Sequence, residues 1–255
     1  MNTEKMPVIF AGHGTPMNAV ETNEASLTWK HLKNKFKKPK AIIAVSAHWS
    51  TDRLYISSAE KNKQIFDMEG FPKKLYEVKY RPKGSFLFAD KARSNLSDIA
   101  EFNNDWGVVH GVWEILCNMY PKADIPVVMM SCNIAESERF QFQVGEKLKS
   151  LREEGALILA SGNIVHNLGL LSFSGTGEDW AINFNRRIKE SVLNKDYETA
   201  INYRNIEFSD FAVPTPEHYY PLLTALGAVD NDSVEIFNDY FDMGAVSMTS
   251  FIWRN

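Results

Sequence analysis

The stretch AIIAVSAHW, residues 41–49, decides the fold class of this 255-residue chain. Its first seven residues form a nearly continuous apolar run, which is typical of a strand buried on both faces of a parallel sheet. Similar runs recur at VIFA (8–11), PVVMMS (126–131) and ALILA (156–160). The segment 136–154 between the last two carries apolar residues at helical spacing and is followed by a glycine. Strands that alternate with amphipathic helices predict an α/β fold.

The rest of the chain continues this alternation. We expect further helices at 27–36, 86–102, 112–120, 180–193 and 217–226, and further strands at 54–57, 234–238 and 245–253. No internal repeat, low-complexity tract or linker interrupts the pattern. We therefore predict one domain over residues 1–255, with a central, largely parallel or mixed sheet flanked by helices.

Composition excludes several classes of function. Apolar residues make up 44% of the chain, charged residues 24%, and the formal net charge is −4. This balance disfavours binding to nucleic acid or to a membrane surface, both of which need a basic face. No apolar run is long enough to span a bilayer, and the N-terminus does not resemble a signal peptide. We expect a cytoplasmic protein, monomeric or a small homo-oligomer, in which Cys117 and Cys132 remain buried thiols.

Five of the six histidines fall at the ends of predicted elements. His13, His48 and His166 each follow a predicted strand, whereas His110 and His218 lie near the starts of predicted helices. In an open α/β sheet, ligand sites form beyond the carboxyl ends of the strands. A single histidine at such a place is usually a hydrogen-bonded structural residue, but the combination predicts one shared crevice. The sixth histidine lies in a lysine-rich helix and is interpreted as an exposed bystander.

Converging histidines indicate a metal centre. Neutral imidazole is the commonest metal ligand, and dispersed ligands without cysteine are typical of a catalytic site with an open coordination position. No carboxylate matches the histidines in placement: Asp67, Glu69 and Asp105 lie in predicted loops, and Glu217 is adjacent to His218. An all-histidine shell leaves the full double positive charge of the ion. Such a centre suits an anionic bidentate ligand such as a catecholate.

Residues beside the histidines complete the predicted pocket. Gly12 and Gly14 leave space for a ligand to approach the backbone near His13. Polar neighbours that can fix a histidine tautomer are Ser46, Asn163 and Asn167, and the aromatic residues of a predicted pocket wall are Trp49, Trp106, Tyr219 and Tyr220. Of these we predict Trp49, Asn163 and Tyr219 as substrate contacts, although core packing is the alternative for each aromatic residue.

Five ordered motifs carry a resemblance to a known family. They are GHGTPMN (12–18), SAHW (46–49), WGVVHGVW (106–113), SGNIVHN (161–167) and PTPEHYYPL (214–222). Together they resemble the 4,5-DOPA-type extradiol ring-cleavage dioxygenases, which belong to the class III extradiol superfamily and are similar to the catalytic subunit of protocatechuate 4,5-dioxygenase. The resemblance runs from residue 7 to about residue 252.

The resemblance implies a catechol-type aromatic substrate, O2 and a divalent metal, Fe²⁺ or Zn²⁺. By motif position, His13, His48 and His218 are implied to be metal ligands. His166 is implied to be either a further ligand or the acid–base residue, and because an imidazole pKa lies near neutrality we take it as the candidate base. His110 is implied to contact substrate or bound oxygen. Ring cleavage requires iron, because zinc has no redox chemistry.

This chain departs from the family pattern in two places. Val109 stands where the family motif commonly carries an aspartate before the histidine, which removes one potential partner of His110. Phe66 and Lys79 stand where some relatives carry histidines, so substrate contacts are expected to differ. None of these positions belongs to the implied metal ligands.

Two other functions compete with ring cleavage. One is a zinc-dependent hydrolase that uses a metal-bound hydroxide and works without oxygen. The other is a non-enzymatic binding protein on the same scaffold, because a fold does not determine a function. The presence of all five motif histidines argues against the binding protein.

Overall fold

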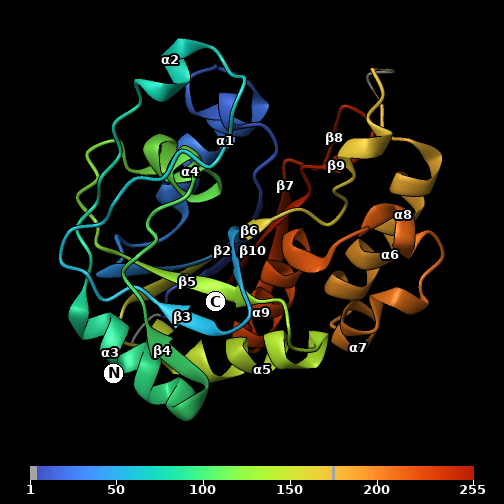
Figure 1. The fold of residues 1–255 in the computed structure, drawn as a ribbon. Coiled ribbons are helices and arrows are strands. Elements are labelled where there is room, and N and C mark those ends of the chain that lie inside the picture. The colour runs from blue at the N-terminus through green and yellow to red at the C-terminus, as the bar shows by residue number, and fades with distance from the viewer. Residues whose placement is uncertain (1–4, 174–175) are drawn as a thin grey trace.

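The computed structural model describes residues 5–173 and 176–255, which build a mixed sheet covered by helices on both faces (Figure 1). The strand order is β4 (Ala100–Phe102), β3 (Leu54–Ile56), β5 (Val127–Asn133), β2 (Ala41–Thr51), β6 (Ala156–Gly162), β1 (Val8–Gly12), β10 (Ser250–Arg254) and β7 (Ser233–Phe237). The four central strands, β5, β2, β6 and β1, are parallel. β10 runs antiparallel to β1, and β3 antiparallel to β5. The predicted α/β fold with a central mixed sheet is confirmed.

The helices divide between the two faces and one flank of the sheet. The face that carries the N-terminal helix is covered by α1 (Glu24–Leu32), α2 (Lys73–Tyr76) and α4 (His110–Met119). The opposite face is covered by α3 (Phe86–Leu96), α5 (Glu138–Leu148) and α9 (Tyr220–Ala228). Beside α9 lie α6 (Asp179–Leu193), α7 (Tyr197–Ile201) and α8 (Ser209–Ala212) (Figure 1). A separate hairpin pairs β8 (Phe241–Asp242) with β9 (Val246–Ser247).

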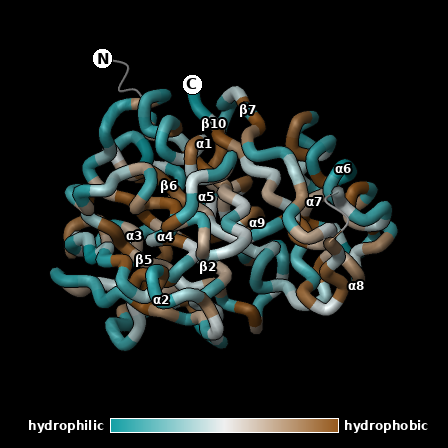
Figure 2. The backbone as a smooth tube through the Cα atoms, turned by 90° about the horizontal axis from the view of Figure 1, so that it is seen from above, coloured by the Kyte–Doolittle hydropathy of each residue, from teal (hydrophilic) through white to brown (hydrophobic). Residues whose placement is uncertain are grey.

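The continuous apolar runs of the central strands have a direct structural cause. Ile43 and Val45 of β2 point into the core beneath α3, α5 and α9, whereas Ile42 and Ala44 point into the core beneath α1 and α4. Successive side chains of a strand face opposite sides, so a strand covered on both sides needs apolar residues at every position. In Figure 2 the chain near the labels β6 and β10 is hydrophobic, and the outer loops are largely hydrophilic.

The observed elements correct several predicted boundaries, and the predicted strand 245–253 is divided into β9 and β10. The predicted helix 86–102 is wrong at its end, because α3 stops at Leu96 and the last three residues form β4, which pairs with β3. The predicted helix 217–226 is divided: Pro216–His218 is a 3-10 turn, and α9 begins at Tyr220. β2 extends to Thr51, so His48 lies within the strand rather than after it, near a shift in pairing register with β5.

Both cysteines are free thiols, as predicted. Cys132 is buried in β5, and Cys117 is partly buried on α4. Within the described ranges, 5–173 and 176–255, the helices are too short or too polar to cross a membrane.

A buried ion pair joins segments that are distant in sequence. The guanidinium of Arg152 is fully buried and donates to both carboxylate oxygens of Asp232 at 2.8 Å. It also donates to the carbonyl oxygens of Met6 and Ala228. The chain before β1, the end of α9 and the turn before β7 therefore meet at one side chain. Removing it leaves the Asp232 carboxylate buried without its cation.

We therefore predict that Arg152→Ala lowers the free energy of unfolding by roughly 3–5 kcal/mol, the usual cost of removing one partner of a buried pair. Denaturant unfolding followed by circular dichroism measures this loss. Arg53→Ala is the control, because Arg53 pairs with Glu101 on the exposed surface and its loss should change little. Equal unfolding midpoints for the two variants would contradict the role assigned to Arg152.

Candidate metal centre

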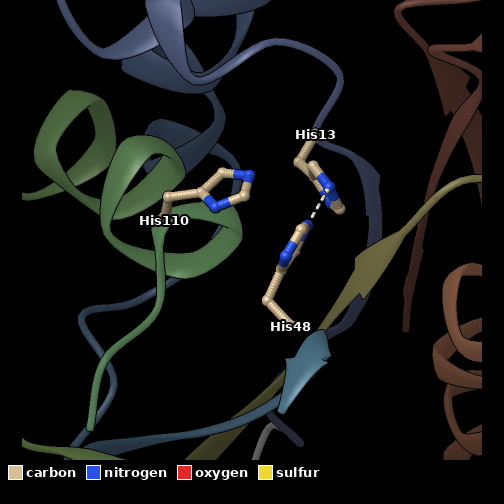
Figure 3. A group of neighbouring side chains, drawn as sticks. All are labelled: His13, His48 and His110. Carbon is tan, nitrogen blue, oxygen red and sulfur yellow. Dashed lines mark hydrogen bonds between the residues drawn. The ribbon is translucent and has the colours of Figure 1, made fainter. Parts of the chain in front are cut away.

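Five histidines surround one cavity of about 500 Å³. They are His13, His48, His110, His166 and His218, and they all line it. Figure 3 shows three of them, His13, His48 and His110, with their rings turned toward one another. One ring nitrogen from each of these three lies within 4.8 Å of the others. The predicted convergence of the five histidines is therefore present in the structure, whereas His31 lies exposed on α1.

The fold brings these side chains together from separate elements. His13 follows β1, and His48 lies on β2, which is separated from β1 only by β6. His110 is the first residue of α4, and His218 ends the turn before α9. His166 follows β6, and its backbone forms an isolated bridge with Val246 of β9. The carboxyl ends of three parallel strands thus supply or flank the site, as expected for an open α/β sheet.

Asp67 orients two of the histidines. Its Oδ2 accepts from Nδ1 of His48 and from Nδ1 of His110, each at 3.0 Å, and its Oδ1 accepts from the backbone N–H of His110 at 3.0 Å. Burial alone would raise the pKa of this carboxyl, but the hydrogen bonds from His110 and His48 hold it well below its usual range. Because each Nδ1 is engaged by the carboxylate, each Nε2 remains the nitrogen available to a metal.

A serine holds His13 in the same tautomer. The Ser161 hydroxyl donates to the carbonyl oxygen of Gly111 at 2.5 Å, so its oxygen is left to accept from Nδ1 of His13 at 3.1 Å. Nε2 of His13 therefore carries a lone pair, and it lies 3.0 Å from Nε2 of His48. Desolvation by burial and the four neighbouring imidazoles lower the pKa of His13 well below its usual value. Its neutral form, the form that binds metals, is favoured.

His218 repeats this arrangement with an oxygen of the residue before it in the chain. Its Nδ1 lies 3.3 Å from Oε1 of Glu217, which also accepts from the Thr215 hydroxyl. Burial lowers the pKa of His218 to about 4, although the hydrogen bond with Glu217 opposes the change. Nε2 of His218 is buried and has no hydrogen-bond partner in the part of the chain that the structure describes. A buried polar atom without a partner is costly, and a metal ligand bond would satisfy it.

His166 lies flat against His218. Their ring centroids are 3.5 Å apart and the planes are inclined by 5°. Burial, followed by the charges of His218 and His48, lowers the pKa of His166 to about 3. The sequence analysis took His166 as a candidate base because the ordinary pKa of imidazole lies near neutrality. The pKa of His166 in the structure is well below that value. His166 is therefore neutral at physiological pH, with a ring nitrogen able to accept a proton.

The donor set fits a divalent metal ion. His13, His48, His110 and His218 each have Nδ1 engaged by an oxygen acceptor, which leaves Nε2 unprotonated. A carboxylate or other oxygen behind a ligating imidazole is the usual arrangement around protein-bound metals. The ring centroid of His218 lies 5.4 Å from that of His13 and 5.1 Å from that of His48. His110 and His218 are therefore rival third partners of the pair His13 and His48.

The glycines beside His13 make room for protein rather than for a ligand. A Cβ on Gly12 would lie 2.8 Å from the backbone of Met248, and a Cβ on Gly14 would collide with the Met248 side chain. Gly14 also has a φ of +64°, which disfavours any residue with a side chain. The expectation that these glycines open the backbone to a ligand is corrected for Gly12, which lets the chain between β9 and β10 pack against the site; Gly14 does this too, and it also lines the cavity.

The three predicted substrate contacts do not line the cavity. Trp49 is buried in the core beneath α4. Tyr219 is fully buried, and its hydroxyl donates to the carbonyl oxygen of Ala200. Asn163 donates from Nδ2 to the carbonyl oxygen of Ser247, so it ties the turn after β6 to β9. For both aromatic residues the packing alternative is correct, because inward-facing positions next to a strand end or helix start also serve the core.

Most of the remaining cavity wall consists of residues that sequence patterns did not indicate. Beyond the histidines and Asp67 it is formed by Gly14, Thr15, Pro16, Met68, Phe71, Leu168, Asp242, Met243 and Val246. Most are apolar residues of irregular segments, where no periodicity marks the face that a side chain occupies. Thr15 and Pro16 belong to the TPMN part of the first motif. The apolar wall suits a planar aromatic ligand.

Comparison with known proteins agrees with this geometry. The family model described as the catalytic LigB subunit of aromatic ring-opening dioxygenase matches residues 8–252. The chain belongs to this family. It is 37% identical to the 4,5-DOPA dioxygenase extradiol of Escherichia coli K12, over 98% of this chain and 95% of that protein. It is 35% identical to the Beta vulgaris protein of the same name, over 95% of this chain and 94% of that protein.

A solved structure supports the same conclusion. The crystal structure of an uncharacterized protein from Escherichia coli K12 superposes with a TM-score of 0.85 at 35% identity, and the match covers 97% of this chain and 99% of that one. As a member of the LigB family, the chain is an extradiol ring-cleavage dioxygenase, of a metal-dependent family.

In this member of the LigB family, another carboxylate takes the place of the aspartate that is missing at Val109. Val109 is fully buried in the core beneath α4 and caps that helix without a side-chain hydrogen bond. Asp67, from a loop 43 residues earlier, supplies the carboxylate that binds His110. Asp67 was one of three loop carboxylates considered in the sequence, but nothing in its spacing distinguished it from Glu69 or Asp105.

We predict that Asp67→Asn weakens metal binding about 10- to 100-fold, because His48 and His110 lose the anionic acceptor that orients them. Competition with a chromophoric chelator measures the affinity directly. Glu69→Gln removes an equal charge two residues away, from an exposed side chain, and should leave the affinity as it is. Equal affinities in the two variants would show that Asp67 does not orient the metal ligands.

Proposed function

We propose that the protein opens the ring of a catechol with O2 at a divalent metal ion, Fe²⁺ in the active form, held by His13, His48 and His218. The observation that carries the proposal is the group of five imidazoles around a cavity of about 500 Å³ with an apolar wall, in which ring nitrogens of His13, His48 and His110 lie within 4.8 Å of one another. The metal-dependent dioxygenase family to which the chain belongs supports the same chemistry.

Residues of the chain bind the ring, accept a proton and contact the reacting atoms. A bound divalent ion acidifies the catechol hydroxyls and, as Fe²⁺ but not Zn²⁺, supports electron transfer from the ring to O2. Met68, Phe71 and Leu168 hold the ring and exclude water. His166 lines the same cavity and accepts the proton of one hydroxyl at a ring nitrogen. His110, fixed by Asp67, presents Nε2 to the reacting atoms.

Two observations favour His218 over His110 as the third metal ligand. Nε2 of His218 is a buried nitrogen without a partner among the described residues, so a ligand bond removes an existing penalty. His110 and His48 share one oxygen of Asp67, and their ring centroids lie only 3.9 Å apart. We therefore assign His110 to the substrate side of the ion.

Alanine variants separate these assignments. His13→Ala, His48→Ala and His218→Ala should each lose bound metal by elemental analysis, whereas His110→Ala should keep it and lose turnover. Circular dichroism confirms that each variant is folded, and His31→Ala, at an exposed histidine, is the matched control. Metal retained by His218→Ala and lost by His110→Ala would replace His218 with His110 in the ligand set.

The two roles open for His166 are separable in the same way. If it accepts the substrate proton, His166→Gln should retain stoichiometric metal and lose turnover by roughly 100-fold or more, the usual contribution of acid–base catalysis. The loss should be largest at low pH, where fewer catechol molecules ionise without a base, and a pH profile of kcat measures this. Loss of metal from the variant would make His166 a ligand instead.

The reaction itself is tested by anaerobic reconstitution with Fe²⁺ or Zn²⁺, followed by catechols and air. We expect a yellow ring-opened product and one O2 consumed per ring with Fe²⁺, and no product with Zn²⁺. Turnover of ester or amide substrates by the zinc form in the absence of O2 would favour a hydrolase. If the iron form opens none of the catechols, the proposed reaction is wrong.

A further inference from the structure

A carboxylate on the cavity wall has no role in the site described above. Asp242 is the last residue of β8, is partly buried and lines the same cavity as the five histidines. Its carboxylate accepts a hydrogen bond from the backbone of Met243, and burial raises its pKa from the usual value. A partly desolvated carboxylate that faces a ligand cavity is stabilised by any cation that a ligand brings.

The hairpin fixes where this carboxylate points. Asp242 is paired directly with Val246 across β8 and β9, and directly paired residues place their side chains on the same face. Val246 also lines the cavity, so the shared face is the one turned toward the ligand. Val246 forms the bridge to His166, and the N–H of Asn167 donates to the carbonyl oxygen of Ala245. The backbone of His166 and Asn167 therefore holds the hairpin in place.

The surroundings of Asp242 offer it no protein cation. In the described parts of the chain it takes part in no ion pair, and the residues that line the cavity include neither lysine nor arginine. The other carboxylate of the wall, Asp67, is already bound to His48 and His110. Nδ1 of His13, His48, His110 and His218 is engaged by oxygen atoms of other residues, and none of these contacts involves Asp242.

We propose that Asp242 binds the protonated amine of a substrate side chain, so that the preferred substrate is a catechol that carries an ammonium group and no carboxylate. The inference rests on the proposed function, because it assumes that the catechol end of the ligand lies at the histidines. A deprotonated catechol offsets the charge of the divalent ion, and the cavity wall supplies no lysine or arginine to Asp242. An ammonium restores neutrality, whereas a side-chain carboxylate would meet Asp242 with the same sign and find no cation.

Hydrogen bonding to Met243 gives Asp242 an alternative role as a residue that stabilises the turn. Met243 has a φ of 45° and Gly244 a φ of 70°, so the turn needs a specific backbone conformation. A purely structural role would affect every ligand alike, whatever its charge. The two roles therefore differ in the ratio of affinities for charged and neutral ligands, not in the affinity for any one ligand.

The experiment uses three catechols of similar size with the Zn²⁺-loaded protein, in which no ring cleavage competes with binding. They are 4-(2-aminoethyl)catechol, neutral 4-ethylcatechol and 3-(3,4-dihydroxyphenyl)propionate, titrated by calorimetry at pH 7. We expect the amine to bind at least 10-fold more tightly than 4-ethylcatechol, as is usual for a charge-assisted hydrogen bond, and the carboxylate to bind most weakly. Equal affinity for the amine and the neutral ligand would overturn the proposal without any variant.

Variants then assign the preference to one side chain. Asp242→Asn should reduce the amine-to-neutral affinity ratio about 10-fold, and Asp242→Lys should reverse the order of the amine and the carboxylate. Asp98→Asn is the matched control, because it removes the same charge from an exposed side chain next to β4, at the edge of the sheet. A ratio in Asp242→Asn equal to that of the control would overturn the proposal.

Turnover by the Fe²⁺-loaded protein distinguishes failure of this inference from failure of the proposed function. If 4-ethylcatechol is opened but the amine has no advantage in kcat/KM, the function stands and the role of Asp242 is wrong. If the amine binds the Zn²⁺ form selectively but the Fe²⁺ form opens none of the three rings, the recognition stands and the reaction is wrong. If none of the three ligands binds, both proposals are overturned.

Discussion

Parallel pairing of β1, β6 and β2 is the constraint on which the site depends. β1 and β6 pair in register from Val8 with Ile158 to Gly12 with Gly162, and β2 pairs with β6 up to Ser46 with Ser161. This register places two histidines together at the carboxyl ends of the parallel strands. They are His13, just past Gly12, and His48, two residues past Ser46. It also puts the Ser161 hydroxyl within 3.1 Å of Nδ1 of His13, where it selects the tautomer. The apolar side chains that fix the register thereby also position the metal ligands.

Asp67 adds a second constraint, from outside the sheet. Two imidazoles share one of its oxygens, and its other oxygen fixes the backbone at the start of α4. The same carboxylate therefore sets the tautomers of His48 and His110 and the position of the helix that carries His110. A loop residue can do this only if its own backbone is held, and the loop is held: the N–H of Ile65 donates to the carbonyl oxygen of Val108 and the N–H of Val108 to that of Lys63.

The sequence was sufficient to predict the α/β fold and the convergence of the histidines, because both depend on local periodicity and on the rule that strand ends meet. It was not sufficient to predict that residues 100–102 form an edge strand, because so short a segment is defined by its pairing with β3. The roles of Asp67 and Ser161 as hydrogen-bond partners of the histidines could not be predicted for a related reason. Each acts through a contact with a residue more than 40 positions away in the sequence. Tyr219 and Trp49 show the opposite error, since a residue beside a functional histidine can still point into the core.

The β8–β9 hairpin separates the composition of the cavity wall from the position of the imidazoles. It contributes part of the cavity wall but none of the imidazoles, and backbone hydrogen bonds to the segment around His166 and Asn167 hold it in place. Such bonds do not depend on side-chain identity, so a cavity-facing side chain such as Asp242 can be replaced while the hairpin keeps its position, whereas Gly244, with a φ of 70°, is constrained. A substitution at a cavity-facing position can therefore change which molecules are admitted without moving the imidazoles.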